Sequence, residues 1–278
     1  MQLETSIESL AAHIPDHALV AIAKEPQEPV ALGHAIAGQG RRNLTLVNVP
    51  TGSYLTDILI GAGCVGTIQT SGVSLGEHGQ ASRFNAAVRS GDTQIMDATC
   101  PAVYAALQAG EKGIPFIPMR GLIGSDILAQ RPDWKVIDNP FADRGDPIVL
   151  LPAIRPDYAL MHVALADRFG NLWVGGRNEY KTMAHAAHAT LATAESISDT
   201  NLLEDPRLAA NCISALYVEA IAVAEKGAWP SACNAPGGGL LYEKDNAHIA
   251  EYARIARDAD GFQQYMQGFG AVSQDAAE

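Results

Sequence analysis

The alternation of short apolar runs with amphipathic stretches is the feature that most constrains this chain. Apolar runs rich in β-branched residues predict strands, at residues 18–23, 43–49, 64–71, 93–99, 115–119, 148–151, 158–163, 172–174, 190–193 and 218–223. Stretches of helical periodicity between them predict helices, at residues 30–37, 53–61, 80–88, 101–110, 181–189, 244–256 and 261–266. This order predicts an α/β fold, with a Rossmann-like open, mostly parallel sheet and helices on both faces.

One segment interrupts the alternation. Residues 122–147 are dense in Gly, Pro and Asp, which is typical of a long functional loop or a cap. No tandem repeat, low-complexity tract or Pro-rich linker divides the chain. We therefore expect one domain over residues 1–278, with an irregular insertion at about 122–147.

Charge and cysteine usage exclude several classes of protein. The net charge is −12 and Arg41-Arg42 is the only basic doublet, which argues against nucleic acid or an anionic membrane as a partner. The start of the chain lacks the pattern of a signal peptide, and no run reaches the roughly 18 apolar residues of a membrane span. The four cysteines form no CxxC pair, so we expect neither a metal site nor a disulfide scaffold. A cytoplasmic protein is the simplest interpretation.

Six segments in order carry a family resemblance. They are 70–73 with 82–84, 113–118, 137–141, 156–162, 166–171 and 227–233. Together they resemble the α subunits of class I coenzyme A transferases, the glutaconate type among them. The resemblance covers about residues 16–268.

The resemblance implies a reaction and a partner. In this family a glutamate carboxylate takes CoA from an acyl-CoA as a glutamyl-CoA thioester, and an acceptor carboxylate then receives the CoA. Where the subunits are separate, that glutamate lies on the β chain, and its motif is not found here. The resemblance therefore implies an α subunit in an αβ or α2β2 assembly, with CoA as co-substrate and a small carboxylate as acceptor.

Ser71, Gly72 and Val73 are the first candidates for substrate binding. They end a predicted strand, at the edge of a parallel sheet where ligands bind. The Ser71 hydroxyl and backbone N–H groups could hold a substrate carboxylate or thioester oxygen. The alternative is a plain strand-to-loop turn.

Three other residues are candidates for chemistry. Glu77 has the carboxylate of a nucleophile, although a role at the start of a helix is the stronger interpretation. Cys100 stands at a predicted helix start, where the dipole favours a thiolate, although buried inert cysteines are commoner. Asp97, like Glu77, could act as a base if the enzyme were a hydrolase.

A second set of candidates follows the strand that ends near Met119. Arg120 could pair with a carboxylate or phosphate, or form a surface ion pair with Asp126 or another loop acid. Gly121, Gly124 and Ser125 could let the backbone approach a ligand. The turn at Gly175-Gly176-Arg177 has the same two interpretations.

Histidines complete the candidates. His162 lies in an apolar run, which is usual for a core histidine, and the family resemblance also fits a role near the substrate. His185 and His188 are three apart on a predicted helix and read as a polar face. Glu195 matches a family pattern without a defined role.

Two departures from the family pattern concern the site. Ala21-Ile22-Ala23 stands where relatives have Gly-Gly-Phe, and Trp229 stands where they have a histidine. Both changes argue against glutaconate as substrate. They leave open two alternatives to a transferase: a CoA-thioester hydrolase subunit, including the ring-opening type, and a subunit that only binds ligand or supports structure.

Overall fold

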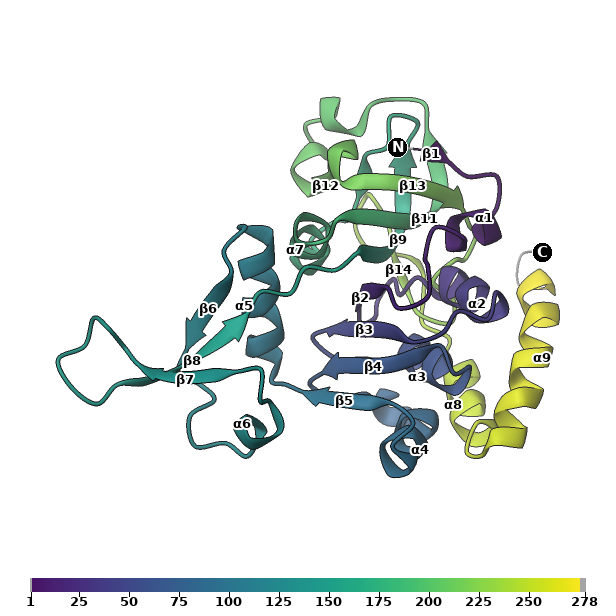
Figure 1. Cartoon of the computed structure of the whole chain (residues 1–278). Coiled ribbons are helices and arrows are strands. Elements are labelled where there is room, and N and C mark those ends of the chain that lie inside the picture. Colours follow the sequence, from purple (N-terminus) through teal and green to yellow (C-terminus); the bar gives the residue numbers. More distant parts are fainter. Residues whose placement is uncertain (1, 276–278) are drawn as a thin grey trace.

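The computed structural model describes residues 2–275, and side chains up to residue 268. Its main sheet has eight parallel strands in the order β1-β13-β11-β9-β2-β3-β4-β5 (Figure 1). Their bounds are β1 Gln2–Leu3, β2 Leu19–Ala23, β3 Leu44–Val49, β4 Val65–Thr70, β5 Gln94–Asp97, β9 Tyr158–Asp167, β11 Ala189–Ser198 and β13 Val218–Val223. The short strands β10 (Leu172–Trp173) and β12 (Cys212–Ile213) extend the sheet beside β9 with antiparallel pairing. The predicted open, mostly parallel sheet is confirmed.

Helices cover both faces of this sheet, as predicted. Side chains of one strand alternate between two cores: Ile22 of β2 packs with helices α2 and α3, whereas Ala21 and Ala23 pack with α5 and α7. The helices are α1 Ile7–Ala11, α2 Val30–Gly38, α3 Tyr54–Gly61, α4 Ser82–Ser90, α5 Cys100–Glu111, α6 Ile127–Gln130, α7 Asn178–Ala186, α8 Asn246–Ile255 and α9 Ala259–Asp275. Each of these strands is buried on both faces between two layers of helices. This explains why the strands appear in the sequence as continuous apolar runs.

The strand order reverses between β2 and β9. From β2 the chain runs outward through β3, β4 and β5, and it then returns to the other side of β2 to form β9, β11 and β13. In open α/β sheets ligands bind at the carboxyl ends of the strands, at such a switch point. The loops after β2, β3, β4 and β5 are therefore expected to form a ligand site.

Residues 116–152 form an arm that projects from the main sheet (Figure 1). The arm is a three-stranded antiparallel sheet in the order β6-β8-β7, with bounds β6 Phe116–Met119, β7 Lys135–Asp138 and β8 Pro147–Pro152. The segment 122–147, expected to be irregular, thus contains helix α6 and strand β7. Strand β7 has only four residues, between two prolines. Its sequence therefore shows too little alternation to predict a strand, and the strand forms only by pairing with β8.

Several boundaries differ from the sequence analysis. Strands β9 and β11 continue to Asp167 and Ser198, beyond the expected ends at 163 and 193. Helix α7 ends at Ala186, so His185 and His188 do not share a helix face as expected. A short hairpin, β14 (Cys233–Asn234) with β15 (Leu240–Tyr242), was not predicted.

Within residues 2–275, no helix is both long enough and apolar enough to cross a lipid bilayer.

Candidate active site

Ser71 and Cys100 meet at the carboxyl edge of the sheet. Ser71 follows β4 and Cys100 is the first residue of α5, just after β5. The Ser71 Oγ lies 3.0 Å from the Cys100 Sγ and donates a hydrogen bond of 2.9 Å to the Pro50 carbonyl, which follows β3. Cys100 is exposed, and the Thr99 hydroxyl caps its helix. Three adjacent strand ends thus build one small polar surface, a pairing that the sequence analysis did not predict.

The backbone N–H groups of the turn at Gly72 are hydrogen-bonded within the protein. The Gly72 N–H donates to the Thr70 Oγ1 (3.1 Å), and the Ser71 N–H donates to the Pro50 carbonyl (3.2 Å). Gly72 has a φ of +144°, and Val73 bridges to Gly52. The N–H groups expected here as donors to substrate are therefore already used, because the turn itself needs them. The side chains of Ser71 and Cys100 are what this edge presents.

Glu77 lies on an exposed turn that follows this edge in the chain. It belongs to a 3₁₀ turn at Gly76–His78, and its side chain is 77% exposed. His78 approaches Glu77 at 3.6 Å but forms a closer hydrogen bond, 2.9 Å, with Asn246 of α8. Helix α4 begins only at Ser82, so Glu77 does not cap it as the preferred interpretation assumed.

Asp97 ends β5, two residues before the cap of α5. Its Oδ1 accepts a hydrogen bond of 2.9 Å from the Ala98 N–H, and its carbonyl accepts one of 3.0 Å from Arg131. Asp97 is thus near Cys100 in the chain, and its carboxylate is occupied by the turn that leads into α5.

The candidates around Arg120 lie on the arm. Arg120 forms a bidentate ion pair with Asp146, at 2.7 and 2.5 Å, and Arg120 with Asn139 lowers the pKa of Asp146 to about 2. The Ser125 hydroxyl bonds to the Leu122 carbonyl of its own turn, beside Gly121 and Gly124. The structure therefore matches the surface-ion-pair interpretation of Arg120, with Asp146 in place of Asp126. It does not bring these residues to Ser71.

His162 is the centre of a buried polar cluster. The His162 Nδ1 lies 2.9 Å from the Thr193 Oγ1, and its Nε2 lies 2.8 Å from the Glu195 Oε1. Glu195 also accepts hydrogen bonds from the Tyr242 hydroxyl (2.7 Å) and the Lys226 N–H (2.8 Å). Burial opposes ionisation of Glu195, but these bonds outweigh it and lower the pKa of the carboxyl. The sequence pointed to His162 and Glu195 separately, and only the sheet register brings them together.

The loop at residues 24–29 follows β2, at the point where the strand order reverses. Arg177 donates hydrogen bonds to the carbonyls of Lys24 (2.8 Å) and Pro26, and the Tyr180 hydroxyl donates to the carbonyl of Gln27 (2.5 Å). Gln27 has a φ of +66° and is fully buried. The Gly-rich turn before Arg177 therefore serves this loop in the structure, and Gln27 is a residue that the sequence analysis missed.

Glu28 is a buried acid in the same loop. It is 1% exposed, and its Oε1 accepts a hydrogen bond of 2.6 Å from the Ser53 hydroxyl. Burial raises the pKa of Glu28 to about 7, against the opposing effect of Ser53. Ser53 precedes α3 and its hydroxyl donates to Glu28 instead of capping the helix, which ties the loop after β2 to the loop after β3.

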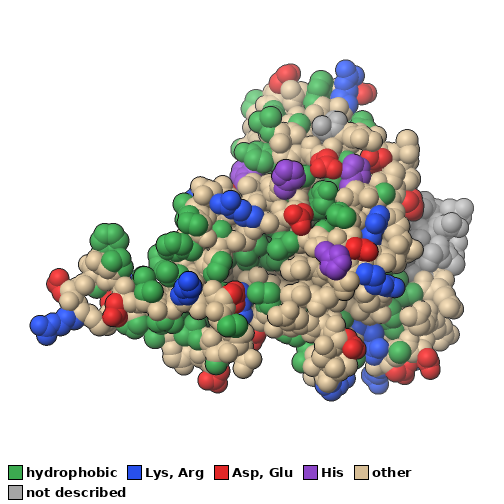
Figure 2. All heavy atoms as spheres, viewed as in Figure 1, with side chains coloured by type: hydrophobic (Ala, Val, Ile, Leu, Met, Phe, Trp, Pro, Cys, Tyr) green, Lys and Arg blue, Asp and Glu red, His purple; other side chains and the backbone are tan. Residues whose placement is uncertain are grey.

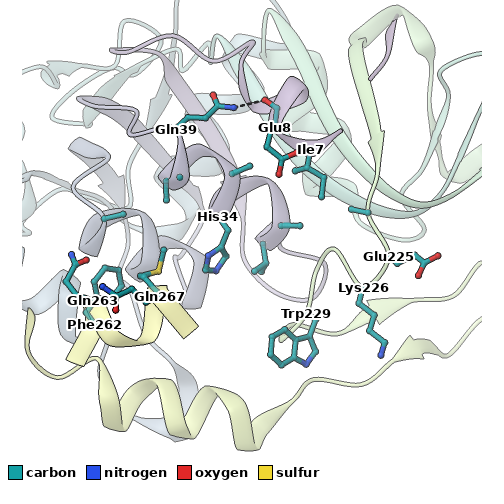
Figure 3. Close-up of a pocket in the computed structure, with 18 of the residues that line it drawn as sticks. Ile7, Glu8, His34, Gln39, Glu225, Lys226, Trp229, Phe262, Gln263 and Gln267 are labelled. Carbon is teal, nitrogen blue, oxygen red and sulfur yellow. Dashed lines mark hydrogen bonds between the residues drawn. The ribbon is translucent and has the colours of Figure 1, made fainter. Parts of the chain in front are cut away.

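A separate cavity lies on the helical side of the molecule. It has a volume of about 1100 Å³ and lies between α2, α9 and the segment 223–229. Figure 3 shows His34 of α2, Trp229 of that segment, and Phe262 and Gln267 of α9 around it. Ser71 and Cys100 are not among its lining residues. Trp229 thus borders this cavity instead of the polar edge at Ser71.

Comparison with known proteins identifies one family. The sequence profile of the family described as "Coenzyme A transferase" matches residues 4–223. The chain is 30% identical to the A subunit of 3-oxoadipate CoA-transferase of Pseudomonas knackmussii, over 90% of this chain and 86% of that protein. It is 31% identical to a protein of Archaeoglobus fulgidus over 85% of this chain, but it spans about half (51%) of that protein's length.

A solved structure agrees with these matches. Glutaconate CoA-transferase of Acidaminococcus fermentans superposes with a TM-score of 0.86, at 25% identity, over 96% of this chain and 88% of that chain. The A subunit of that enzyme is 28% identical over 92% of this chain and 82% of its own length.

Proposed function

Because this chain belongs to the coenzyme A transferase family, we propose that it is the A-type subunit of an enzyme that moves CoA between two short carboxylates. The resemblance to coenzyme A transferase α subunits predicted from the sequence is confirmed. The observation that carries the proposal is that two relatives, both named as A subunits, match over about nine tenths of this chain and more than four fifths of their own length. Such matches cover most of a subunit rather than a short shared fragment.

The reaction is a pair of exchanges that balance without any further reagent. A glutamate carboxylate of the partner takes CoA from the acyl-CoA, which gives an enzyme glutamyl-CoA thioester and a free carboxylate. An acceptor carboxylate then takes CoA from that thioester and restores the glutamate. Protein groups that hydrogen-bond the oxygen on which charge develops lower both barriers.

We assign this chain the wall of the site that faces the partner's glutamate. Ser71 and Cys100 present a hydroxyl and a thiol at the carboxyl edge, 3.0 Å apart. The Ser71 hydroxyl would turn its hydrogen from the Pro50 carbonyl to the thioester oxygen, and Gly72 and Val73 would shape the turn beneath it. Glu77, at 77% side-chain exposure, has no buried surroundings of the kind that activate a nucleophile. This supports a nucleophile on the other chain.

The names of the two relatives suggest a substrate class. Both 3-oxoadipate and glutaconate, for which those enzymes are named, carry two carboxylates. We propose the CoA thioester of a short dicarboxylic acid as substrate. The two departures from the family pattern do not bear on this choice, because Ala21-Ile22-Ala23 is the buried end of β2 and Trp229 borders the separate cavity.

We also propose that the protein works in the cytoplasm. Cys64, Cys100, Cys212 and Cys233 are all free thiols, which suits a reducing compartment.

Intact-mass analysis of the assembled enzyme tests the proposal. The chain is co-purified with the protein encoded beside it and incubated with a dicarboxylyl-CoA, and both chains are weighed with and without borohydride. We expect a CoA-sized mass increase on the partner alone, removed by borohydride. An adduct on this chain would overturn the assignment of the nucleophile. Release of CoA without acceptor and without adduct would instead favour the hydrolase.

A further inference from the structure

Three side chains able to bind a metal meet behind the switch-point loop. His162 comes from β9, Glu195 from β11 and Cys233 from β14, and their ligand atoms all lie within 4.8 Å of one another. We propose that His162, Glu195 and Cys233 form a binding site for one zinc-like divalent ion. This site does not depend on the transferase chemistry proposed above, and the sequence predicted no metal.

The donor atoms select a class of ion. Imidazole nitrogen, thiolate sulfur and carboxylate oxygen are the ligands of zinc and of its close chemical relatives, whereas calcium and magnesium prefer oxygen alone. Thiolate and carboxylate together neutralise a divalent charge. That balance matters here because the side chains of His162 and Cys233 are fully buried, where an unbalanced charge is costly.

Outer contacts already orient two of the ligands. The Thr193 hydroxyl holds the His162 Nδ1 at 2.9 Å, which turns the Nε2 toward Glu195. A Cβ at Gly227 would come within 2.8 Å of that Nδ1, so the backbone of this loop fixes the ring from the side. The Lys226 N–H and the Tyr242 hydroxyl hold the two oxygens of Glu195. Metal sites use such second contacts to fix the ligand geometry.

Small movements convert the cluster into a metal site. The His162 Nε2 and the Glu195 Oε1 are 2.8 Å apart, at hydrogen-bond distance. Tetrahedral bonds of about 2.1 Å would place these two atoms about 3.4 Å apart, so they would separate by roughly half an ångström. The Glu195 side chain is 10% exposed, which leaves an approach for the ion and a fourth position for water.

Binding must displace a proton from the thiol, because the metal-bound form of a cysteine side chain is the thiolate.

Cobalt(II) titration of the full-length chain tests the site without reference to activity. We expect one equivalent to bind with the intense near-ultraviolet absorption of a cobalt–thiolate bond. Cys233→Ser should abolish that absorption and weaken binding at least tenfold. Cys64→Ser is the matched control, because Cys64 is equally buried, with its pKa raised to about 11, yet lies outside the cluster.

Two results would overturn the proposal. One is a wild-type chain that takes up no cobalt at micromolar concentration, and this result needs no variant. The other is an absorption that survives in Cys233→Ser, which would place the metal on Cys100 or Cys212. In either case His162, Glu195 and Cys233 form only a hydrogen-bonded cluster and do not bind a metal ion.

Discussion

At the scale of single residues, Ser71 and Cys100 show how the fold makes a site from separate pieces. They are 29 positions apart, yet their side chains lie at 3.0 Å because β4 and β5 are parallel neighbours that end at the same edge. Both residues were predicted as candidates from their places at a strand end and a helix start. Their contact depended on strand order, which local patterns do not contain.

Ser71→Ala should lower kcat/KM of the assembled enzyme by about tenfold or more and leave folding intact. One hydrogen bond to an oxygen that gains charge in the transition state is worth up to a few kcal/mol. Steady-state kinetics with acyl-CoA and acceptor measure the loss. Ser90→Ala is the control, since the Ser90 hydroxyl bonds to Asp92 at the end of α4. Equal rates for both variants would remove Ser71 from the site.

Glu28→Gln should change how stability depends on pH. The folded pKa of Glu28 is raised to about 7, so ionisation in the unfolded chain, above about pH 4.5, costs the fold stability as pH rises to 7. That cost reaches roughly 3 kcal/mol above pH 7. Glutamine keeps an acceptor for the Ser53 hydroxyl and cannot ionise.

Urea unfolding at pH 5, 6, 7 and 8 measures this difference between variant and wild type. We expect the variant to gain stability relative to wild type as pH rises and to level off above pH 7. Parallel curves across this range would show that Glu28 ionises as readily in the fold as in the unfolded chain.

At the scale of elements, the loop at 24–29 is the clearest surprise. Ala21-Ile22-Ala23, which stands where relatives have Gly-Gly-Phe, is not in this loop but forms the buried end of β2. In the structure the loop is fixed by Arg177 and Tyr180, and Arg177 also stacks 4.5 Å from the Tyr180 ring. A buried guanidinium that satisfies two carbonyls stabilises a backbone that would otherwise lack partners.

Arg177→Lys should destabilise the chain by about 2–4 kcal/mol. One ammonium cannot replace the planar group that bonds two carbonyls and stacks on Tyr180. Chemical denaturation measures the change. Arg207→Lys is a matched control, because Arg207 pairs with Asp205 at 87% side-chain exposure and its replacement should leave stability nearly unchanged. Similar losses for both variants would contradict a structural role for Arg177.

At the scale of the whole molecule, the arm exposes apolar surface. Phe141 is 96% exposed, and Phe116, Val136 and Ile137 are each 41–51% exposed, as the hydrophobic side chains along the arm in Figure 2 illustrate. The arm follows the far end of α5, at Glu111, and it returns to the strand ends at Arg131, which donates a hydrogen bond of 3.0 Å to the carbonyl of Asp97 at the end of β5. A partner that brings a glutamate to the Ser71 edge would lie close to this surface, and subunit contacts commonly bury such patches.

Phe141→Asp combined with Val136→Asp should weaken association with the partner subunit by at least tenfold while the chain alone stays folded. Analytical ultracentrifugation of the mixed chains measures the association. Val88→Asp is the control, because Val88 is 48% exposed but lies on α4. Unchanged association of the arm variant would place the partner elsewhere.

The sequence alone determined the fold class, most strand and helix positions, and the family, because these depend on local periodicity and on motifs in a fixed order. The central strands could be predicted because both of their faces are buried, which requires continuous aliphatic runs. Strand β7 of the arm and the hairpin of β14 and β15 were not predicted, because they are short and form only by pairing.

Only the tertiary structure decided which polar groups meet. The register of β9 against β11 pairs His162 with Thr193 and brings Glu195 near, and the hairpin at Cys233 then completes the cluster. Strand order placed Ser71 beside Cys100, and it left Arg120 on the arm with Asp146. Contacts between residues far apart in the chain depend on how layers pack, and one sequence read locally does not contain that information.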